Sequence, residues 1–242
     1  RGLELTLQDG DFVTVIGGNG AGKSTMLNAI AGVWPIDMGK ILVDGQDITR
    51  LPEHKRAQYI GRVFQDPMMG TAATMQIDEN LALAARRGAK RTLRIGITKK
   101  EHDEYYELLK TLDLGLENRM TSKVGLLSGG QRQAVTLLMA TLKRPKLLLL
   151  DEHTAALDPK TAAKVLELSQ KIVEENHLTT LMITHNMKDA IKYGNRLIMM
   201  HEGHVIYDVR GEEKANLQVS DLLQRFEQVS GGSLDNDRML LS

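Results

Sequence analysis

A glycine-rich run ending in lysine and serine lies near the start of the chain. It comprises Gly17, Gly18, Asn19, Gly20, Ala21, Gly22, Lys23 and Ser24, and Thr25 follows it. The run fits G-x-x-x-x-G-K-S/T, and it lies between a predicted strand at 12–16 and a predicted helix at 24–31. Glycines let successive N–H groups turn toward phosphate oxygens, and a helix N-terminus adds roughly half a positive charge. The run therefore predicts a phosphate-binding loop in which Lys23 reaches the β- and γ-phosphates of a nucleotide, although a solvated glycine-rich turn is the simpler alternative.

An acidic pair supplies the second half of such a site. Asp151 and Glu152 follow an apolar strand predicted at 146–150. We expect Ser24 and Asp151 to hold Mg²⁺, Asp151 through water, and Glu152 to accept a proton from the attacking water. Two acids after a strand are otherwise often a solvated strand end, so this interpretation depends on the phosphate loop.

A third segment lies between these two. It comprises Leu127, Ser128, Gly129, Gly130 and Gln131. Ser128 and Gln131 are spaced as S-x-x-Q, which predicts a capped helix start. A capped helix start with exposed N–H groups is also an anion site, so the cap and a phosphate-binding role are compatible.

With this segment in place, the chain resembles the ATP-binding-cassette ATPases over nearly its whole length. The resemblance implies that Ser128 to Gln131 hold a γ-phosphate. It implies that Gln65 contacts Mg²⁺ and the attacking water, that Asp158 crosses a dimer interface, and that His185 orients the water. Considered alone, Gln65 is an ordinary strand-end residue, Asp158 before Pro159 is a standard helix cap, and a lone histidine such as His185 is more often structural.

The resemblance also implies partners. Two copies of the chain would enclose two ATP molecules with Mg²⁺, each between one copy's phosphate loop and the other's Ser128 segment. We expect an ATPase subunit of a transporter, on the inner face of the cell membrane in the cytoplasm, with a separate transmembrane permease subunit as partner and no nucleic acid. Two alternatives stay open: a soluble cassette ATPase of iron–sulfur assembly or another scaffold, and a nucleotide-gated binding module without turnover.

Two departures from the family pattern stand out. His153 occupies a position where the family usually has proline, which puts the stiffness of the link after Glu152 in question. The aromatic residue that stacks on adenine in the family is expected upstream of Arg1, because only 16 residues precede Gly17 and the chain opens without an initiator methionine. His201 and His204 flank Gly203, and a hairpin turn there is a better interpretation than a metal site.

The elements that must position these residues alternate between apolar runs and helical periodicity, which is typical of an α/β protein. We expect a P-loop NTPase core with a mainly parallel sheet, a small antiparallel β-subdomain and an inserted helical subdomain. Beyond those already given, strands are predicted at 40–43, 46–48, 59–64, 179–184 and 196–200, with another around Leu3, Leu5 and Leu7. The segments 40–43, 46–48 and 59–64 are assigned to the antiparallel sheet. Further helices are predicted at 77–86, 99–112, 130–142, 160–175 and 187–191.

These elements divide the chain into four parts. We expect the ATP-binding core with its β-subdomain at 1–66, a helical signature subdomain at 67–142, the rest of the core at 143–229 and a flexible tail at 230–242. Within the helical part, Met68, Met69 and Met75 follow Gln65 closely. They predict either packing at the joint between core and helices or a groove for a short helix of the permease.

Composition excludes several classes of protein. The 242 residues carry 31 Lys and Arg against 31 Asp and Glu, so no net charge attracts nucleic acid. With Cys 0, the chain has no disulfide, thiolate nucleophile or cysteine-based metal centre.

Overall fold

The computed structural model describes residues 2–89 and 96–230, the last without its side chain. A six-stranded sheet runs in the order β4-β5-β6-β1-β7-β8, and β8 is antiparallel to β7 whereas the other neighbours are parallel. The strands are β1 (Phe12–Ile16), β4 (Ile60–Val63), β5 (Leu147–Asp151), β6 (Thr180–Ile183), β7 (Arg196–His201) and β8 (His204–Arg210). This sheet is the mainly parallel core that the alternating pattern predicted.

Helices complete the molecule. They are α1 (Lys23–Ala31), α2 (Glu53–Arg56), α3 (Ile77–Ala85), α4 (Lys99–Lys110), α5 (Gly129–Thr141), α6 (Pro159–Asn176), α7 (Met187–Lys192), α8 (Gly211–Ala215) and α9 (Val219–Ser230). Short 3₁₀ turns span Leu116–Arg119 and Val124–Leu126. Within the described residues, no helix is both long and apolar enough to cross a membrane.

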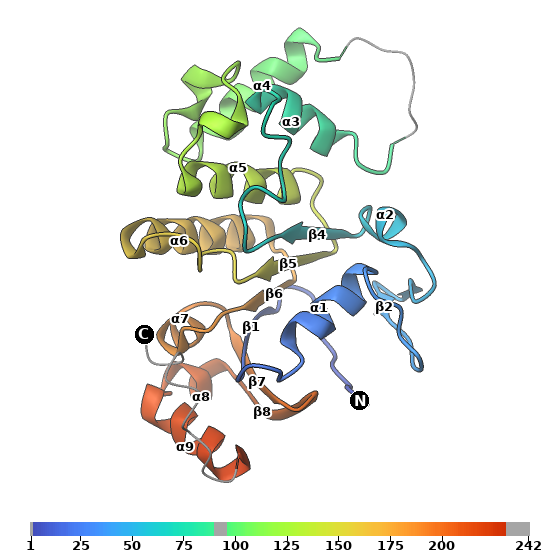
Figure 1. Ribbon diagram of the computed structural model, residues 1–242, viewed down its shortest axis with the longest axis vertical. Coiled ribbons are helices and arrows are strands. Elements are labelled where there is room, and N and C mark those ends of the chain that lie inside the picture. The colour runs from blue at the N-terminus through green and yellow to red at the C-terminus, as the bar shows by residue number, and fades with distance from the viewer. Residues whose placement is uncertain (1, 90–95, 231–242) are drawn as a thin grey trace.

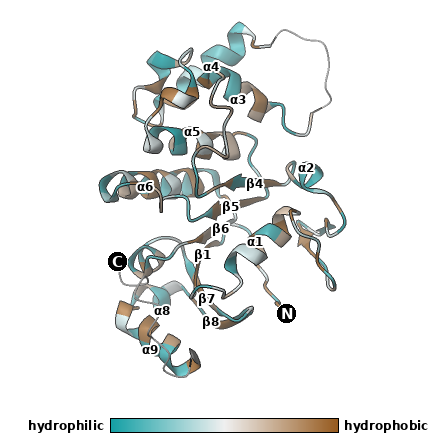
Figure 2. Ribbon diagram, viewed as in Figure 1, coloured by the Kyte–Doolittle hydropathy of each residue, from teal (hydrophilic) through white to brown (hydrophobic). Residues whose placement is uncertain are grey.

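Both faces of the sheet are buried, as a parallel sheet requires. Along β5, Leu147 and Leu149 pack into a core cluster with α1, whereas Leu148 and Leu150 pack on the other side with residues of α5 and α6. Figure 1 shows α1 and α6 on different sides of the strands, and Figure 2 shows the strands as the most hydrophobic part of the ribbon. The all-leucine run at 147–150 therefore reflects burial on two faces.

The helical lobe comprises α3, α4 and α5, beyond the β4 edge of the sheet (Figure 1). Its core is continuous with that of the sheet, because Leu81 of α3 and Leu109 of α4 belong to the same cluster as Leu148 and Leu150. An isolated bridge pairs Gln76 with Lys123 among the described residues of the lobe. The division of the chain at 66 and 142 stays a prediction.

The predicted strand at 59–64 was assigned to the wrong sheet. It forms β4, which pairs in parallel with β5 at the edge of the main sheet. Burial explains this placement, since Ile60, Gly61 and Val63 are all buried and a Cβ on Gly61 would lie 2.5 Å from the carbonyl oxygen of Ala140. The antiparallel sheet contains β2 (Leu42–Val43) and β3 (Gln46–Asp47) alone among the described residues.

The strand expected around Leu3, Leu5 and Leu7 is also wrong. Residues 2–8 form no ladder, although Leu5 and Leu7 pack against the cluster that includes α1. The alternating leucines therefore reflect packing of one side of this segment against the core and not membership of a sheet. The predicted tail at 230–242 lies outside the described residues, apart from the backbone of Ser230.

Candidate nucleotide-binding site

The predicted site residues lie at the carboxyl edge of the sheet. β6 lies between β1 and β5, so the loops that follow these three strands are neighbours: Val15 and Asp151 both pair with Ile183. The segment after β4, which carries Gln65, follows at the outer side of β5, because Val63 pairs with Leu150. The topology therefore brings together four segments that are far apart in the sequence.

The phosphate loop has the strand-turn-helix geometry that its sequence predicts. Gly22 precedes α1 with φ 98, and Gly17 has φ 153 with no room for a side chain, since a Cβ would lie 2.3 Å from the carbonyl oxygen of Met200. Lys23 is buried at 5% exposure, and its Nζ donates to the carbonyl oxygens of Gly17 and Gly18 at 2.5 and 3.0 Å. Ser24 and Thr25 are exposed at the start of the helix, where N–H groups are available to an anion.

The other end of α1 is held by a residue that the sequence analysis missed. Arg56, only 2% exposed, donates to the carbonyl oxygens of Ala29 and Ile30 at 2.6 and 2.8 Å. A cation at the helix C-terminus complements the helix dipole, so Arg56 stabilises the helix that presents the phosphate loop.

Glu152 and His185 meet across neighbouring loops. His185 Nε2 lies 2.6 Å from Glu152 Oε1, and the Glu152 side chain is 12% exposed. Glu152 adopts φ 47, a left-handed conformation that is unfavourable for a residue with a Cβ. Its N–H donates to the carbonyl oxygen of Ile183 at 3.2 Å, and its own carbonyl accepts from Ala155 at 2.9 Å. The contact brings together the two residues expected to activate water.

Asp151 makes an ion pair that the sequence analysis did not anticipate. Arg62 of β4 donates to Asp151 Oδ2 at 2.9 Å, and the Arg62 guanidinium also lies 4.6 Å from the Phe64 ring centroid. No spacing signal could have found this contact, because it follows from β4 and β5 being neighbours. Gln65 is exposed just beyond β4.

The Ser128 segment forms the predicted capping box. Ser128 Oγ accepts from the Gln131 N–H at 3.3 Å, and Gln131 Oε1 accepts from the Ser128 N–H at 3.1 Å. Ser128 and Gly129 are exposed, whereas Gly130 is buried against α6, where an added Cβ would lie 2.2 Å from Thr161 Cγ2. Gly130 therefore has a packing reason to be glycine.

The same helix contacts the segment around Gln65 through residues that the sequence analysis missed. Gln133, fully buried, donates from Nε2 to the carbonyl oxygen of Phe64 at 2.9 Å. Arg132 contacts Met68 Sδ and donates to the carbonyl oxygen of Gly125 at 3.0 Å. No spacing in the sequence marks these two side chains, because their burial results from packing.

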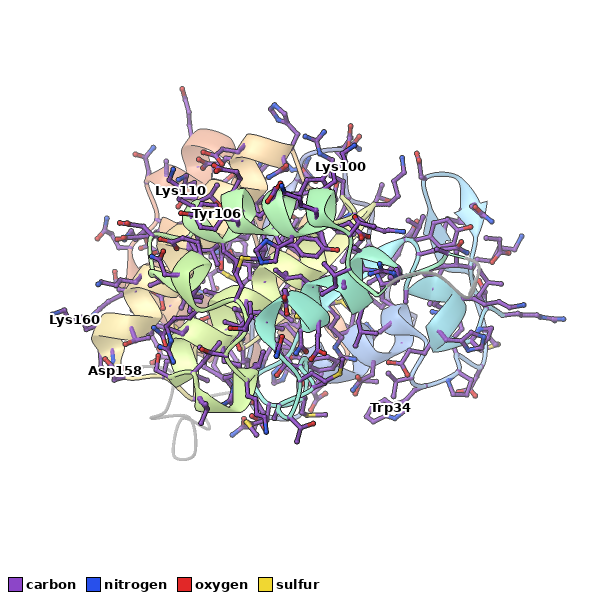
Figure 3. The ribbon with its side chains drawn as sticks, turned by 90° about the horizontal axis from the view of Figure 1, so that it is seen from above. Trp34, Lys100, Tyr106, Lys110, Asp158 and Lys160 are labelled. Atoms are coloured by element: carbon purple, nitrogen blue, oxygen red, sulfur yellow. The ribbon has the colours of Figure 1, made fainter. Side chains whose placement is uncertain are left out.

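Asp158 caps α6 as predicted. Its Oδ1 accepts from the Thr161 N–H at 3.1 Å. Hydrogen bonds from the side chain and the backbone of Thr161 lower the pKa of Asp158 below its ordinary value. Figure 3 shows Asp158 and Lys160 at the outer edge of the molecule, far from Trp34 in this view. The predicted hairpin turn at 201–204 is also confirmed, because His201 pairs with His204 between β7 and β8.

A large cleft of about 2050 Å³ lies between the core and the helical lobe. Met69 and Met75 line it, and Met68 and Met69 are 48% and 68% exposed. Arg62 also lines this cleft, so one side chain reaches from the cleft to Asp151.

A phosphate loop after β1, an acidic pair at the end of β5 and a histidine after β6 define a P-loop ATPase. Comparisons with known proteins agree with this class. A family profile described as ABC transporter matches residues 1–155. The chain therefore belongs to the ATP-binding-cassette family, and it is an ATP-binding and ATP-hydrolysing subunit of an ABC transporter.

Relatives support the same assignment. The chain is 50% identical over 229 residues to a tyrosine transport ATP-binding protein of Clostridioides difficile, covering 93% of this chain and 89% of that protein. It is 34% identical to the methionine import ATP-binding protein MetN 2 of Enterococcus faecalis over 94% of this chain and 64% of that protein. The alternatives of an assembly ATPase and a module without turnover are not supported by these matches.

Solved structures are similar as well. A dimeric ATP-binding cassette in a post-hydrolysis state with ADP and phosphate matches with a TM-score of 0.72 at 30% identity, over 86% of this chain and 88% of that chain. A nucleotide-free cassette of an ABC transporter matches with a TM-score of 0.73 at 28% identity, over 92% and 88% of the two chains. The predicted fold class is thus confirmed.

Proposed function

We propose that this subunit hydrolyses ATP at sites shared between two copies of the chain, and that hydrolysis drives import of a small solute through a separate membrane subunit. The contact of 2.6 Å between His185 and Glu152, beside the phosphate loop, carries the chemical part of the proposal. A carboxylate in contact with a histidine at this edge of the sheet can accept a proton from a water molecule, while the histidine orients that water molecule.

Each remaining site residue has a proposed role. The N–H groups of the loop and Lys23 bind the phosphates, Asp158 lies at the interface with the second copy, and Gln65 senses the γ-phosphate. Ser128, Gly129, Gly130 and Gln131 complete the partner's site, and the exposure of Ser128 and Gly129 supports such a contact. The dimeric state of the similar cassette supports the pairing.

Mg²⁺ is the proposed metal. The donor set is the Ser24 hydroxyl, the Asp151 carboxylate and the Gln65 side-chain oxygen, which are the hard oxygen ligands that Mg²⁺ prefers. Asp151 Oδ2 already accepts a hydrogen bond from the cationic Arg62 guanidinium, and this pairing supports the proposal that the Asp151 carboxylate can hold a cation. When bound, Mg²⁺ would neutralise charge on the phosphates.

An amino acid is the proposed solute class, because the 50% identical relative is a tyrosine transport protein and another relative imports methionine. The permease would dock in the cleft that Met69 and Met75 line, since flexible thioethers suit a helix inserted into a groove. The subunit would then act at the inner face of the cell membrane.

Replacement of the proposed base tests the chemistry. We expect Glu152→Gln to lower turnover by about 10² to 10⁴-fold while ATP binding is preserved, because the amide cannot accept the proton. The variant should also accumulate as a dimer with ATP and Mg²⁺ in gel filtration. Wild-type turnover in this variant would refute the assignment of Glu152.

A charge in the cleft tests the partner. Met69→Glu changes a side chain that is 68% exposed, so folding and ATP binding should be retained while assembly with the permease is lost. Met38→Glu is the matched control, because Met38 is 90% exposed and lies outside the cleft lining. Pull-down with the permease and solute uptake are the measurements, and equal transport by both variants would exclude this cleft.

A further inference from the structure

His153 is a buried residue that the proposed ATP chemistry does not itself use. It follows Glu152 directly and is 1% exposed. A buried imidazole needs hydrogen-bond partners, since an unpaired polar group in the interior is costly.

The imidazole is bonded to helix α6. His153 Nε2 lies 2.9 Å from Ser169 Oγ, and Ser169 Oγ is 2.8 Å from the carbonyl oxygen of Val165. The single hydroxyl proton of Ser169 is directed to Val165, so Ser169 accepts and His153 Nε2–H donates. This assigns the Nε2–H tautomer and a chain of two hydrogen bonds from the loop into α6. Ser169 is fully buried, so water does not compete for either bond.

The backbone conformation of Glu152 depends on how the next residue, His153, is anchored. A non-glycine residue at φ 47 has a strained backbone, which persists where its surroundings fix it. The planar peptide joining Glu152 to His153 transmits any movement of His153 to Glu152. The carboxylate must meet His185 at 2.6 Å, and a shift of about 1 Å at a reacting group can cost ~10² in rate.

We propose that His153 is a positioning residue for ATP hydrolysis: its hydrogen bond to Ser169 anchors the loop after β5 to α6 and thereby orients the Glu152 carboxylate. The inference rests on the proposed role of Glu152 as base. His153 stands where the family usually has proline, and its buried side-chain hydrogen bond restrains the backbone after Glu152 in place of the proline ring.

The test separates the hydrogen bond from the volume of the side chain. His153→Met fills a similar space without a donor, Ser169→Ala removes the acceptor, and His153→Gln restores a donor at a comparable reach. We expect kcat to fall about tenfold or more in His153→Met and Ser169→Ala, with KM for ATP within about twofold. His153→Gln should recover most of this loss.

The double variant His153→Met/Ser169→Ala is the coupling control. Its kcat should be no lower than that of either single variant, because both remove the same bond. Activity is expressed per site that binds ATP, so a loss of folded protein does not lower it. Equal losses in His153→Met and His153→Gln, or multiplying losses in the double variant, would overturn the inference.

Glu152→Gln, measured in parallel, distinguishes this inference from the proposed function. If Glu152→Gln abolishes turnover while His153→Met keeps wild-type kcat, the positioning role fails and the function stands. If Glu152→Gln keeps wild-type turnover, the proposed function itself fails. In the Glu152→Gln background, His153→Met should still form the ATP-bound dimer, and loss of that dimer would show that His153 acts on dimerisation and not on Glu152.

Discussion

At the scale of residues, two energetically unfavourable features lie side by side at the proposed catalytic residue Glu152. Glu152 has a left-handed backbone, and His153 beside it is a histidine held neutral in the interior. Such features are tolerated where neighbouring structure determines them, here the carbonyl oxygen of Ile183 and the hydroxyl of Ser169. Both anchors come from elements other than the loop itself.

The buried imidazole predicts a pH dependence of stability. The pKa of His153 is about 4 in the folded protein and near 6.5 when the chain is unfolded, so the unfolded state binds more protons between these values. The contribution is therefore fully present above about pH 6.5 and is lost as pH falls toward 4. At pH 5 the expected loss in free energy of unfolding is roughly 2 kcal/mol relative to pH 7.5.

Urea unfolding at several pH values measures this effect. His153→Gln removes the titrating group, so its free energy of unfolding should change less between pH 7.5 and 5 than that of the wild type. Parallel pH profiles of the two proteins would contradict the prediction, because other groups would then account for the acid sensitivity.

At the scale of elements, the first turns of α5 serve several purposes at neighbouring positions. Its N-terminus presents Ser128 at the surface, while Gly130 lies against α6 with no room for a side chain. Gln133 of the same helix donates a hydrogen bond to the carbonyl oxygen of Phe64, the residue before Gln65. The helix therefore connects the surface proposed for the partner's nucleotide with the loop proposed to sense its own.

The close approach of α5 and α6 gives an element-scale prediction. Gly130→Ala places a Cβ 2.2 Å from Thr161 Cγ2, so we expect a loss of about 1–2 kcal/mol in the free energy of unfolding without nucleotide. Thr161→Ser deletes that methyl group and keeps the main-chain N–H that Asp158 caps. The double variant should regain most of the loss in thermal unfolding, and an undiminished loss would mean that the helices separate for another reason.

At the scale of the whole molecule, the proposed halves of the nucleotide site belong to different parts of the fold. The phosphate loop lies at the carboxyl edge of the sheet, and Ser128 is exposed at the start of α5 in the helical lobe. Under the function proposed above, a second copy related by two-fold symmetry would complete each site.

Mixing two inactive variants tests the shared site. Lys23→Ala and Ser128→Arg each damage both sites of their own dimer, whereas a mixed dimer carries both changes at one site and leaves the other intact. We therefore expect ATPase activity to recover on mixing. Lys23→Ala with Glu152→Gln is the matched control, because each site of that mixed dimer keeps one defect. Recovery in the control, or none in the test mixture once mixed dimers are demonstrated, would contradict sharing.

Much of the site could be predicted from local signals in the sequence. The phosphate loop, the capping box of Ser128 and the cap of Asp158 depend on residues within a few positions of one another, so their spacing is visible in the chain. The boundaries of β1, α1 and α5 follow from the same signals. Hydrogen bonds between near neighbours, such as helix caps, depend on local residue types.

Other features were decided by the tertiary structure. The burial of β4 in the main sheet, the pairing of Arg62 with Asp151 and the bond from His153 to Ser169 join residues whose separation along the chain carries no information. Strand order and the register of neighbouring helices place these groups in contact. The sequence by itself determined the chemical groups and their local geometry, whereas packing decided which distant groups hold them in place, because a long-range contact exists only once the intervening elements have folded.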